Sequence, residues 1–120
     1  MKSMQQLTHG NIDIPASWLE GRSIDDYMVL RVSGNAMFPT FQDGDKLLIL
    51  QQSELDHSGQ MVVVLDDDGQ ASIRIVELGT GWAKLSPINP QEPPSILQGA
   101  AIKQLTILGV PKQLIRCLIP

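Results

Sequence analysis

A series of short runs of β-forming residues, each followed by a turn signal, constrains this chain most. YMVLRVS (27–33) ends at a glycine, KLLIL (46–50) follows a Gly-Asp pair, and QMVVVLD (60–66) leads into DDDGQ. Apolar β-branched residues favour strands, whereas Gly and Asp tolerate the backbone angles of tight turns. The nearly continuous apolar run at 60–66 is typical of a strand that is buried on both faces. The pattern predicts a mostly β chain.

The rest of the chain continues this pattern. QASIRIVEL (70–78) has strand-type alternation, GTGWAKLS (79–86) predicts a turn and a short strand, and AAIKQLTILGV (100–110) predicts a further strand. INPQEPPS (88–95) holds three prolines and is expected to be an extended surface loop, because proline cannot donate to a central ladder. Together these segments predict a mostly β domain whose bent sheets close partly into a barrel.

Two further segments are apolar without a clear strand pattern. IPASWLEG (14–21) predicts a short helical or turn segment with Trp18 and Leu19 facing inward. PKQLIRCLIP (111–120) is apolar at Leu114, Ile115, Leu118 and Ile119.

Length and charge limit the possible functions. A chain of 120 residues is enough for one domain with its own core. Nine basic and 13 acidic residues give a net charge of −4. The chain therefore lacks the excess of positive charge that is typical of nucleic-acid-binding domains. No apolar run approaches the roughly 18 residues of a membrane helix, and the N-terminus lacks the apolar core of a signal peptide. A cytoplasmic protein that does not contact a membrane is expected.

The potential metal ligands are poorly spaced. Cys117 is the single cysteine and lies in an apolar run, so a small buried hydrophobe is expected there. His9 and His57 have no companions at zinc-ligand spacing. The acidic run at 66–68 lacks the spaced ligands of a calcium loop and is expected to be a solvated hairpin tip. The sequence therefore predicts no metal and no cofactor.

Four blocks in order carry a resemblance to a known family. They are LRVSG, NAMFPTFQDGDKLLIL, GQMVVVLDDDGQASIRIVELG and WAKLSPINPQ, within about residues 10 to 110. Together they resemble the LexA-like (S24) self-cleaving peptidase domain of the SOS repressor, lambdoid phage repressors and the mutagenesis protein UmuD. The resemblance implies a LexA/signal-peptidase-like fold.

The resemblance also implies which positions would carry chemistry. In that family a serine between the glycine and the methionine is the nucleophile, and a lysine on the hairpin strand after DDG is the general base. A serine hydroxyl needs such a neighbour to remove its proton, and a desolvated lysine can be neutral enough to do so. Here the two positions hold Ala36 and Arg74. Alanine has no hydroxyl and arginine stays protonated, so we expect no peptidase activity.

Three alternatives stay open, and the first two explain the residues at these positions. An engineered Ser→Ala change in a self-cleaving Ser/Lys repressor accounts for Ala36 but not for Arg74. A naturally non-cleaving member accounts for both with one cause, and we favour it for that reason. A polymerase accessory protein that resembles UmuD is the third.

Without catalysis, the remaining motif residues are expected to be structural. Gly34 lets the chain turn away from its strand. Met37 and Phe38 are expected to pack into the core, and Pro39 to set the next turn. Gly44 is expected to have a positive φ.

The polar residues of the motif suggest particular contacts. Asp45 can accept hydrogen bonds from nearby backbone amides. Arg74 either occupies the former lysine slot and pairs with Asp43 or Asp45, or extends into solvent. A buried arginine without an acceptor would be costly, so an inward side chain requires a partner.

Loss of catalysis leaves association as the expected function. Members of the family dimerise through this domain, often through strands near the C-terminus, and a self-complementary patch there would give a two-fold dimer. Ordinary core is the alternative reading of the same apolar residues. The expected interface residues are Leu105, Ile107, Leu114, Ile115 and Leu118.

The resemblance implies a phage-type repressor whose dimers and higher oligomers assemble on operator DNA. Contact with the operator would come only from an N-terminal helix-turn-helix domain, which these 120 residues do not include. Since cleavage would not inactivate such a repressor, an antirepressor protein is the expected partner for its release.

Overall fold

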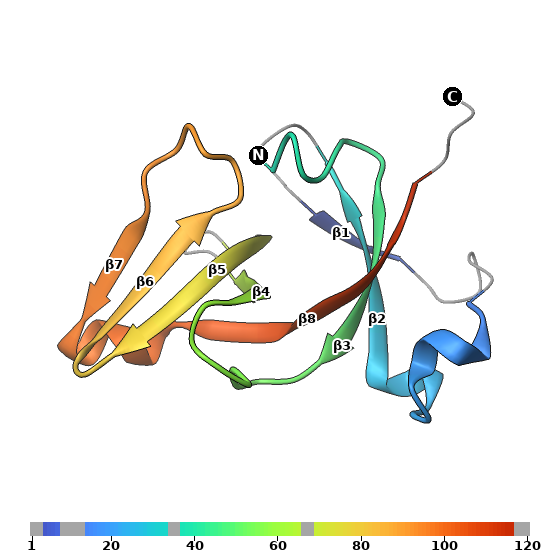
Figure 1. The fold of residues 1–120 in the computed structure, drawn as a ribbon, viewed down its shortest axis with the longest axis horizontal. Helices are drawn as coiled ribbons and strands as arrows, with labels where there is room; N and C mark the ends of the chain where they lie inside the picture. The colour runs from blue at the N-terminus through green and yellow to red at the C-terminus, as the bar shows by residue number, and fades with distance from the viewer. Residues whose placement is uncertain (1–3, 8–13, 34–36, 66–68, 117–120) are drawn as a thin grey trace.

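The computed structural model describes residues 4–7, 14–33, 37–65 and 69–116. These residues form strands and short 3₁₀ helices, in agreement with the mostly β prediction (Figure 1). The strands are β1 (Met4–Leu7), β2 (Tyr27–Val32), β3 (Lys46–Gln51), β4 (Gln60–Leu65), β5 (Ala71–Gly79), β6 (Trp82–Pro87), β7 (Ser95–Gln98) and β8 (Thr106–Ile115). The 3₁₀ helices are η2 (Ala16–Leu19), η3 (Ile24–Asp26) and η4 (Gly99–Gln104). Within the described residues no helix is long and apolar enough to cross a membrane.

All the strands belong to one antiparallel sheet with the order β1-β2-β3-β8-β4-β5-β6-β7. The last strand, β8, therefore lies between β3 and β4 and joins two groups of strands, as Figure 1 shows. The sheet bends enough to bring β1 against β5, although the two are far apart in strand order. It does not close into a barrel, because β1 and β7 remain its two edges.

Strand β8 changes partner at Gly109. This glycine pairs with Val63 of β4 on one side and with Gln51 of β3 on the other. A Cβ atom built on Gly109 would lie 2.4 Å from the carbonyl oxygen of Leu50 and 2.6 Å from Cγ2 of Ile49. Glycine is thus required because two backbones approach closely at this point.

The predicted strand at 100–110 was wrong in both its bounds. Residues Gly99–Gln104 form η4, and the strand that follows continues past Pro111 to Ile115. Pro111 is tolerated because the register shifts beside it: Ile49 pairs with Pro111 and Leu48 with Gln113, which leaves one extra residue in β8. A bulge is where a strand can accept proline.

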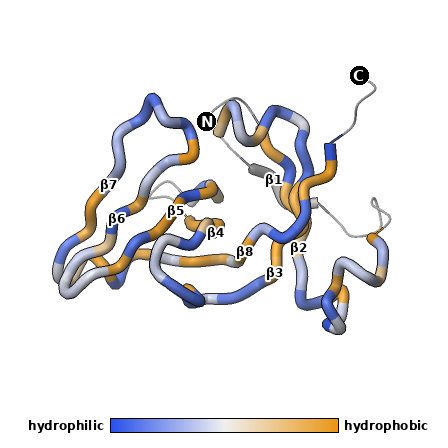
Figure 2. The backbone as a smooth tube through the Cα atoms, in the orientation of Figure 1, coloured by the Kyte–Doolittle hydropathy of each residue, from blue (hydrophilic) through white to orange (hydrophobic). Residues whose placement is uncertain are grey.

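The proline-rich segment between β6 and β7 is followed by a short strand that the sequence analysis did not predict. Residues 88–94 link the two strands as predicted, but β7 begins at Ser95, directly after the last proline. Figure 2 shows hydrophilic residues at the tip of this link and hydrophobic stretches along β2, β3 and β8.

The bent sheet has an inner face and an outer face, both apolar. The inner core consists of Leu30, Val32, Met37, Phe41, Leu47, Ile49, Val63 and Ile73. On the outer face, η2 covers one cluster, and the predicted inward residues Trp18 and Leu19 pack there against Tyr27, Val29, Leu48 and Leu50. The hydroxyl of Tyr27 donates to the carbonyl oxygen of Leu19 at 2.8 Å. A second outer cluster consists of Val62, Val64, Val76 and Val110.

Candidate functional site

The described part of the predicted motif is residues 37–45, which we call the motif loop. Its first turn is closed by a hydrogen bond of 2.9 Å from the amide of Phe41 to the carbonyl of Met37. Met37 is buried in the inner core as predicted, and Phe41 is buried beside it. Phe38 is 52% exposed, so the prediction that it packs into the core was wrong. The reason is that an i to i+4 turn aims residues 37 and 41, rather than neighbours, to one side.

The Gly-Asp pair closes the base of the motif loop. Gly44 has a φ of +90°, which confirms the predicted positive value. Its amide donates to the carbonyl of Val32 at 2.8 Å, and the amide of Val32 donates to the carbonyl of Asp45 at the same distance. The loop thus leaves the end of β2 and returns directly opposite it. Pro39 is exposed within the loop, whereas Gly34 and Ala36 lie outside the described residues.

The carboxylate of Asp45 accepts three hydrogen bonds at the base of the loop. Asp45 is only 2% exposed, and its Oδ2 accepts the amide of Gln42 at 2.8 Å, as predicted. Arg116 adds two further bonds, from Nε to Oδ1 at 2.8 Å and from Nη2 to Oδ2 at 2.7 Å. This bidentate geometry is the strong form of an arginine–carboxylate pair.

The two charges shift each other's titration. The hydrogen bond from Arg116 holds the pKa of Asp45 below its ordinary value, with a smaller opposite effect from burial. In return, the hydrogen bond to Asp45 raises the pKa of Arg116. The pair is therefore ionised at neutral pH.

The sequence reasoning missed Arg116. Lys46 of β3 pairs with Ile115 of β8, so the next positions outward in an antiparallel ladder are Asp45 and Arg116. Finding this contact from the sequence would have required the register of β3 with β8, because Asp45 and Arg116 are 71 positions apart in the chain. The only local signal was a basic residue within an apolar run.

Arg74, the predicted former base position, lies in the middle of β5. It pairs with Val62 of β4 and with Pro87 of β6, and its side chain is half-buried. Its Nη1 donates to the carbonyl of Ile73 at 3.4 Å. Arg116 forms the bidentate contact with Asp45, and the pairing of Arg74 with Asp43 or Asp45 stays a prediction.

The predicted interface residues fall into two groups, one around the start of β8 and one around its end. Leu105 and Ile107 are half-buried and pack against the second outer cluster. Leu114 is 42% exposed, and Ile115 beside it is half-buried. Leu118 lies outside the described residues. The structure therefore brings the first group to the core and leaves Leu114 at the surface.

An apolar groove lies beside Leu114. It has a volume of about 170 Å³. One wall comes from the motif loop and β3, and another from the distal part of β8. Its lining residues are Phe41, Leu47, Met61, Pro111, Lys112, Gln113 and Leu114.

Comparison with known proteins identifies the family. A family model described as Peptidase S24-like matches residues 1–111. The chain belongs to the S24-like peptidase family. It is 31% identical over 97 residues to proteins named LexA repressor from Bacillus mycoides and Bacillus cereus, which covers 80% of this chain and 43–44% of those proteins. A LexA repressor from an Exiguobacterium species is 30% identical over 86 residues, which covers 71% of this chain and 39% of that protein. This S24-like chain spans less than half the length of these relatives.

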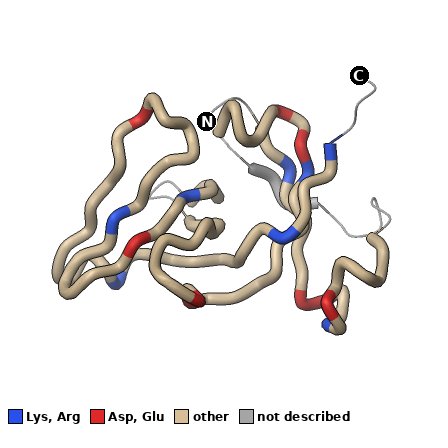
Figure 3. The backbone as a smooth tube through the Cα atoms, in the orientation of Figure 1, with Lys and Arg blue, Asp and Glu red and all other residues tan. Residues whose placement is uncertain are grey.

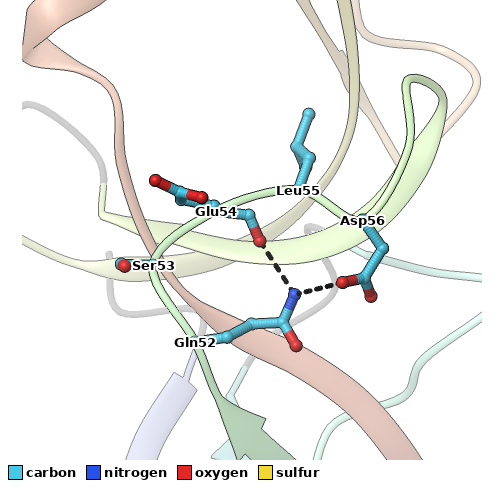
Figure 4. A pocket seen from close by; sticks show the side chains of 5 residues that line it. All are labelled: Gln52, Ser53, Glu54, Leu55 and Asp56. Atoms are coloured by element: carbon cyan, nitrogen blue, oxygen red, sulfur yellow. Dashed lines mark hydrogen bonds between the residues drawn. The ribbon is translucent and has the colours of Figure 1, made fainter.

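A second hollow of the S24-like domain is built from the loop between β3 and β4 (Figure 4). It is a shallow, open hollow of about 360 Å³ lined by residues 52–56. The amide group of Gln52 donates to the carbonyl of Glu54 at 2.8 Å and to Asp56 at 3.3 Å, and Gln60 donates to Asp56 at 2.9 Å. Hydrogen bonds from Gln60 and then Gln52 lower the pKa of Asp56. These contacts fix the loop and engage the carboxylate of Asp56.

The charges of the S24-like domain are dispersed. Figure 3 shows Lys and Arg distributed over many elements of the described chain rather than gathered on one of them. Across the described residues, no three His, Cys, Asp or Glu side chains are grouped so that they could hold a metal ion.

Proposed function

We propose that this S24-like domain is the C-terminal assembly and regulatory domain of a phage-type transcriptional repressor, and that it does not cleave itself. The observation that carries the proposal is the distal part of β8, where Leu114 is 42% exposed beside an apolar groove. The names of the relatives, LexA repressor, support the repressor class.

The chemistry of two positions supports the non-cleaving state. The resemblance to self-cleaving members puts Ala36 where a serine hydroxyl would attack and Arg74 where a lysine would accept its proton. A methyl group cannot attack a carbonyl, and a guanidinium does not give up its proton at neutral pH. Both halves of the reaction are missing, so restoring one of them leaves the other absent.

The geometry of β8 supports self-association. Within the described part of the chain, Pro111 and Gln113–Ile115 pair with β3 and lie beyond Gly109, the last position of β8 that pairs with β4. An unpaired edge with an apolar side chain is a ready site for another strand. A second copy of the chain, related by a two-fold axis, presents the same edge and the same groove to the first copy.

Assembly of this kind strengthens operator binding without any base contact from the domain itself. Two linked DNA-binding units bind with a raised effective concentration, which increases overall affinity by orders of magnitude. In this proposal the units are N-terminal helix-turn-helix domains, the protein acts in the cytoplasm, and an antirepressor protein releases it.

Sedimentation velocity over a range of protein concentrations tests the assembly function. The proposal predicts a reversible dimer that dissociates on dilution. A strict monomer at the highest soluble concentration would remove the function proposed for this domain.

Incubation of the full-length protein at alkaline pH, or with the activated RecA filament, tests the non-cleaving state. We expect the Ala36→Ser variant to stay intact, because Arg74 cannot act as base. Self-cleavage of Ala36→Ser would identify instead an active repressor that carries an inactivating substitution. The Ala36→Ser/Arg74→Lys double variant then shows whether the frame still supports the reaction once both groups are present.

A further inference from the structure

The Asp45–Arg116 ion pair lies where two segments end together. Lys46 and Ile115 form the last backbone pair of β3 with β8, and the ion pair continues that ladder by one position through side chains. Asp45 is also the last residue of the motif loop, and Arg116 directly follows the proposed assembly strand. One side-chain contact therefore joins the loop to the end of β8.

The bonds around this pair hold the loop on several sides. The amide of Asp45 donates to the carbonyl of Gln42 at 3.0 Å, and the amide of Gln42 donates back to the Asp45 carboxylate. Arg116 reaches the loop a second time, from Nη2 to the carbonyl of Thr40 at 3.5 Å. A displacement of Arg116 therefore removes partners from two points of the loop.

The apolar groove provides a second connection between the same two segments. Phe41 of the motif loop and Leu114 of β8 both line it. Phe41 is 7% exposed and belongs to the inner core, so its position depends on how the loop is closed. Because Phe41 lines the groove together with Leu114, a shift of the loop changes the shape of the groove beside Leu114.

We propose that the Asp45–Arg116 pair is a latch that couples the motif loop to the distal end of β8, so that the order of the loop and the presentation of the Leu114 edge change together. Coupling between two sites is reciprocal, because each state of one biases the other. Docking of a partner on the β8 edge orders the loop, and a contact that displaces the loop loosens the edge. The assembly half of this statement rests on the proposed function, whereas the coupling within one chain does not.

Amide hydrogen exchange of the Arg116→Gln variant tests the latch. Exchange reports local opening of a structure, and we expect it to become about tenfold faster or more at the amides of Phe41, Gln42 and Gly44. Amides in the β5–β6 ladder should be unchanged. Lys103→Gln is the control, because Lys103 is an exposed cation of η4 that lies outside both the motif loop and the lining of the groove.

A second variant separates the latch from simple loss of charge. Arg116→Lys keeps the charge but cannot form the bidentate contact, so it should accelerate exchange in the loop nearly as much as Arg116→Gln. Unchanged exchange in the motif loop of both variants would overturn the proposal. Sedimentation of the same variants is an independent readout, in which the latch predicts weaker association. If the unmodified chain never associates, the proposed function fails while the exchange data still decide the coupling.

Discussion

The two halves of β8 have similar apolar composition and different roles. The first half, Thr106–Gly109, pairs with β4, and its residue Ile107 packs with Leu105 against the second outer cluster. The second half pairs with β3 and leaves Leu114 42% exposed beside the groove. The difference shows that apolar side chains on one strand do not all belong to the core. The partner strand on each side decides which of them are covered.

The point where the halves meet should be the most sensitive position of the strand. Gly109→Ala places a Cβ atom 2.4 Å from a backbone oxygen of β3, which cannot move without disturbing the ladder. We expect the free energy of unfolding to fall by about 3 kcal/mol, as for overpacked cores. Denaturant unfolding measures it, with the exposed Thr106→Ala as control. Equal stability of the two variants would show that the backbones of β8 and β3 are not closely packed at Gly109.

Truncation of one side chain in each half sharpens the comparison. Ile107→Ala removes packing from the second outer cluster and should lower the free energy of unfolding by about 2 kcal/mol. Leu114→Ala removes a side chain that is already partly in water and should lower it by less than about 1 kcal/mol. Both values come from denaturant titrations at a protein concentration low enough to keep the chain monomeric. Similar losses for the two variants would contradict the division of β8 into core and surface.

The smallest expected effect concerns the end of the second half, which is held by charge rather than by apolar burial. The pKa of Asp45 is lowered from 3.8, so its ion pair stabilises the fold above that value and loses this contribution as the pH falls through the lower folded value. The stability difference between the unmodified chain and Asp45→Asn should be constant from pH 7 down to about pH 5 and shrink below about pH 4. Thermal unfolding across this range measures it. A difference that grows in acid would contradict the pairing.

The parts of the fold that depend on local pattern could be predicted from the sequence. The runs at β2, β3, β4 and β5 consist of apolar β-formers bounded by turn residues, and each forms a strand within about one residue of its expected bounds. The short edge strands β1 and β7 were missed, because four residues carry too little periodicity to stand out. The segment of η4 was assigned to a strand on its apolar content alone.

The site was less predictable, because it depends on contacts between distant segments. Met37, Gly44 and the amide contact of Asp45 follow from the motif itself. Phe41 is buried in the core in place of the predicted Phe38, and this depends on how the loop turns. The Arg116 contact depends on the register of β3 with β8. The predicted interface included both core and surface residues, because contacts with distant strands decide which side chains are covered.

Sedimentation velocity of the Leu114→Arg variant tests the central claim most directly. A charged side chain at this exposed position should leave folding intact but introduce repulsion and an unpaired buried charge between two copies. We predict a concentration-dependent dimer for the unmodified chain and for the control Thr106→Arg, and a monomer for Leu114→Arg. Identical association of all three chains would contradict the assignment of the distal half of β8 as the assembly surface.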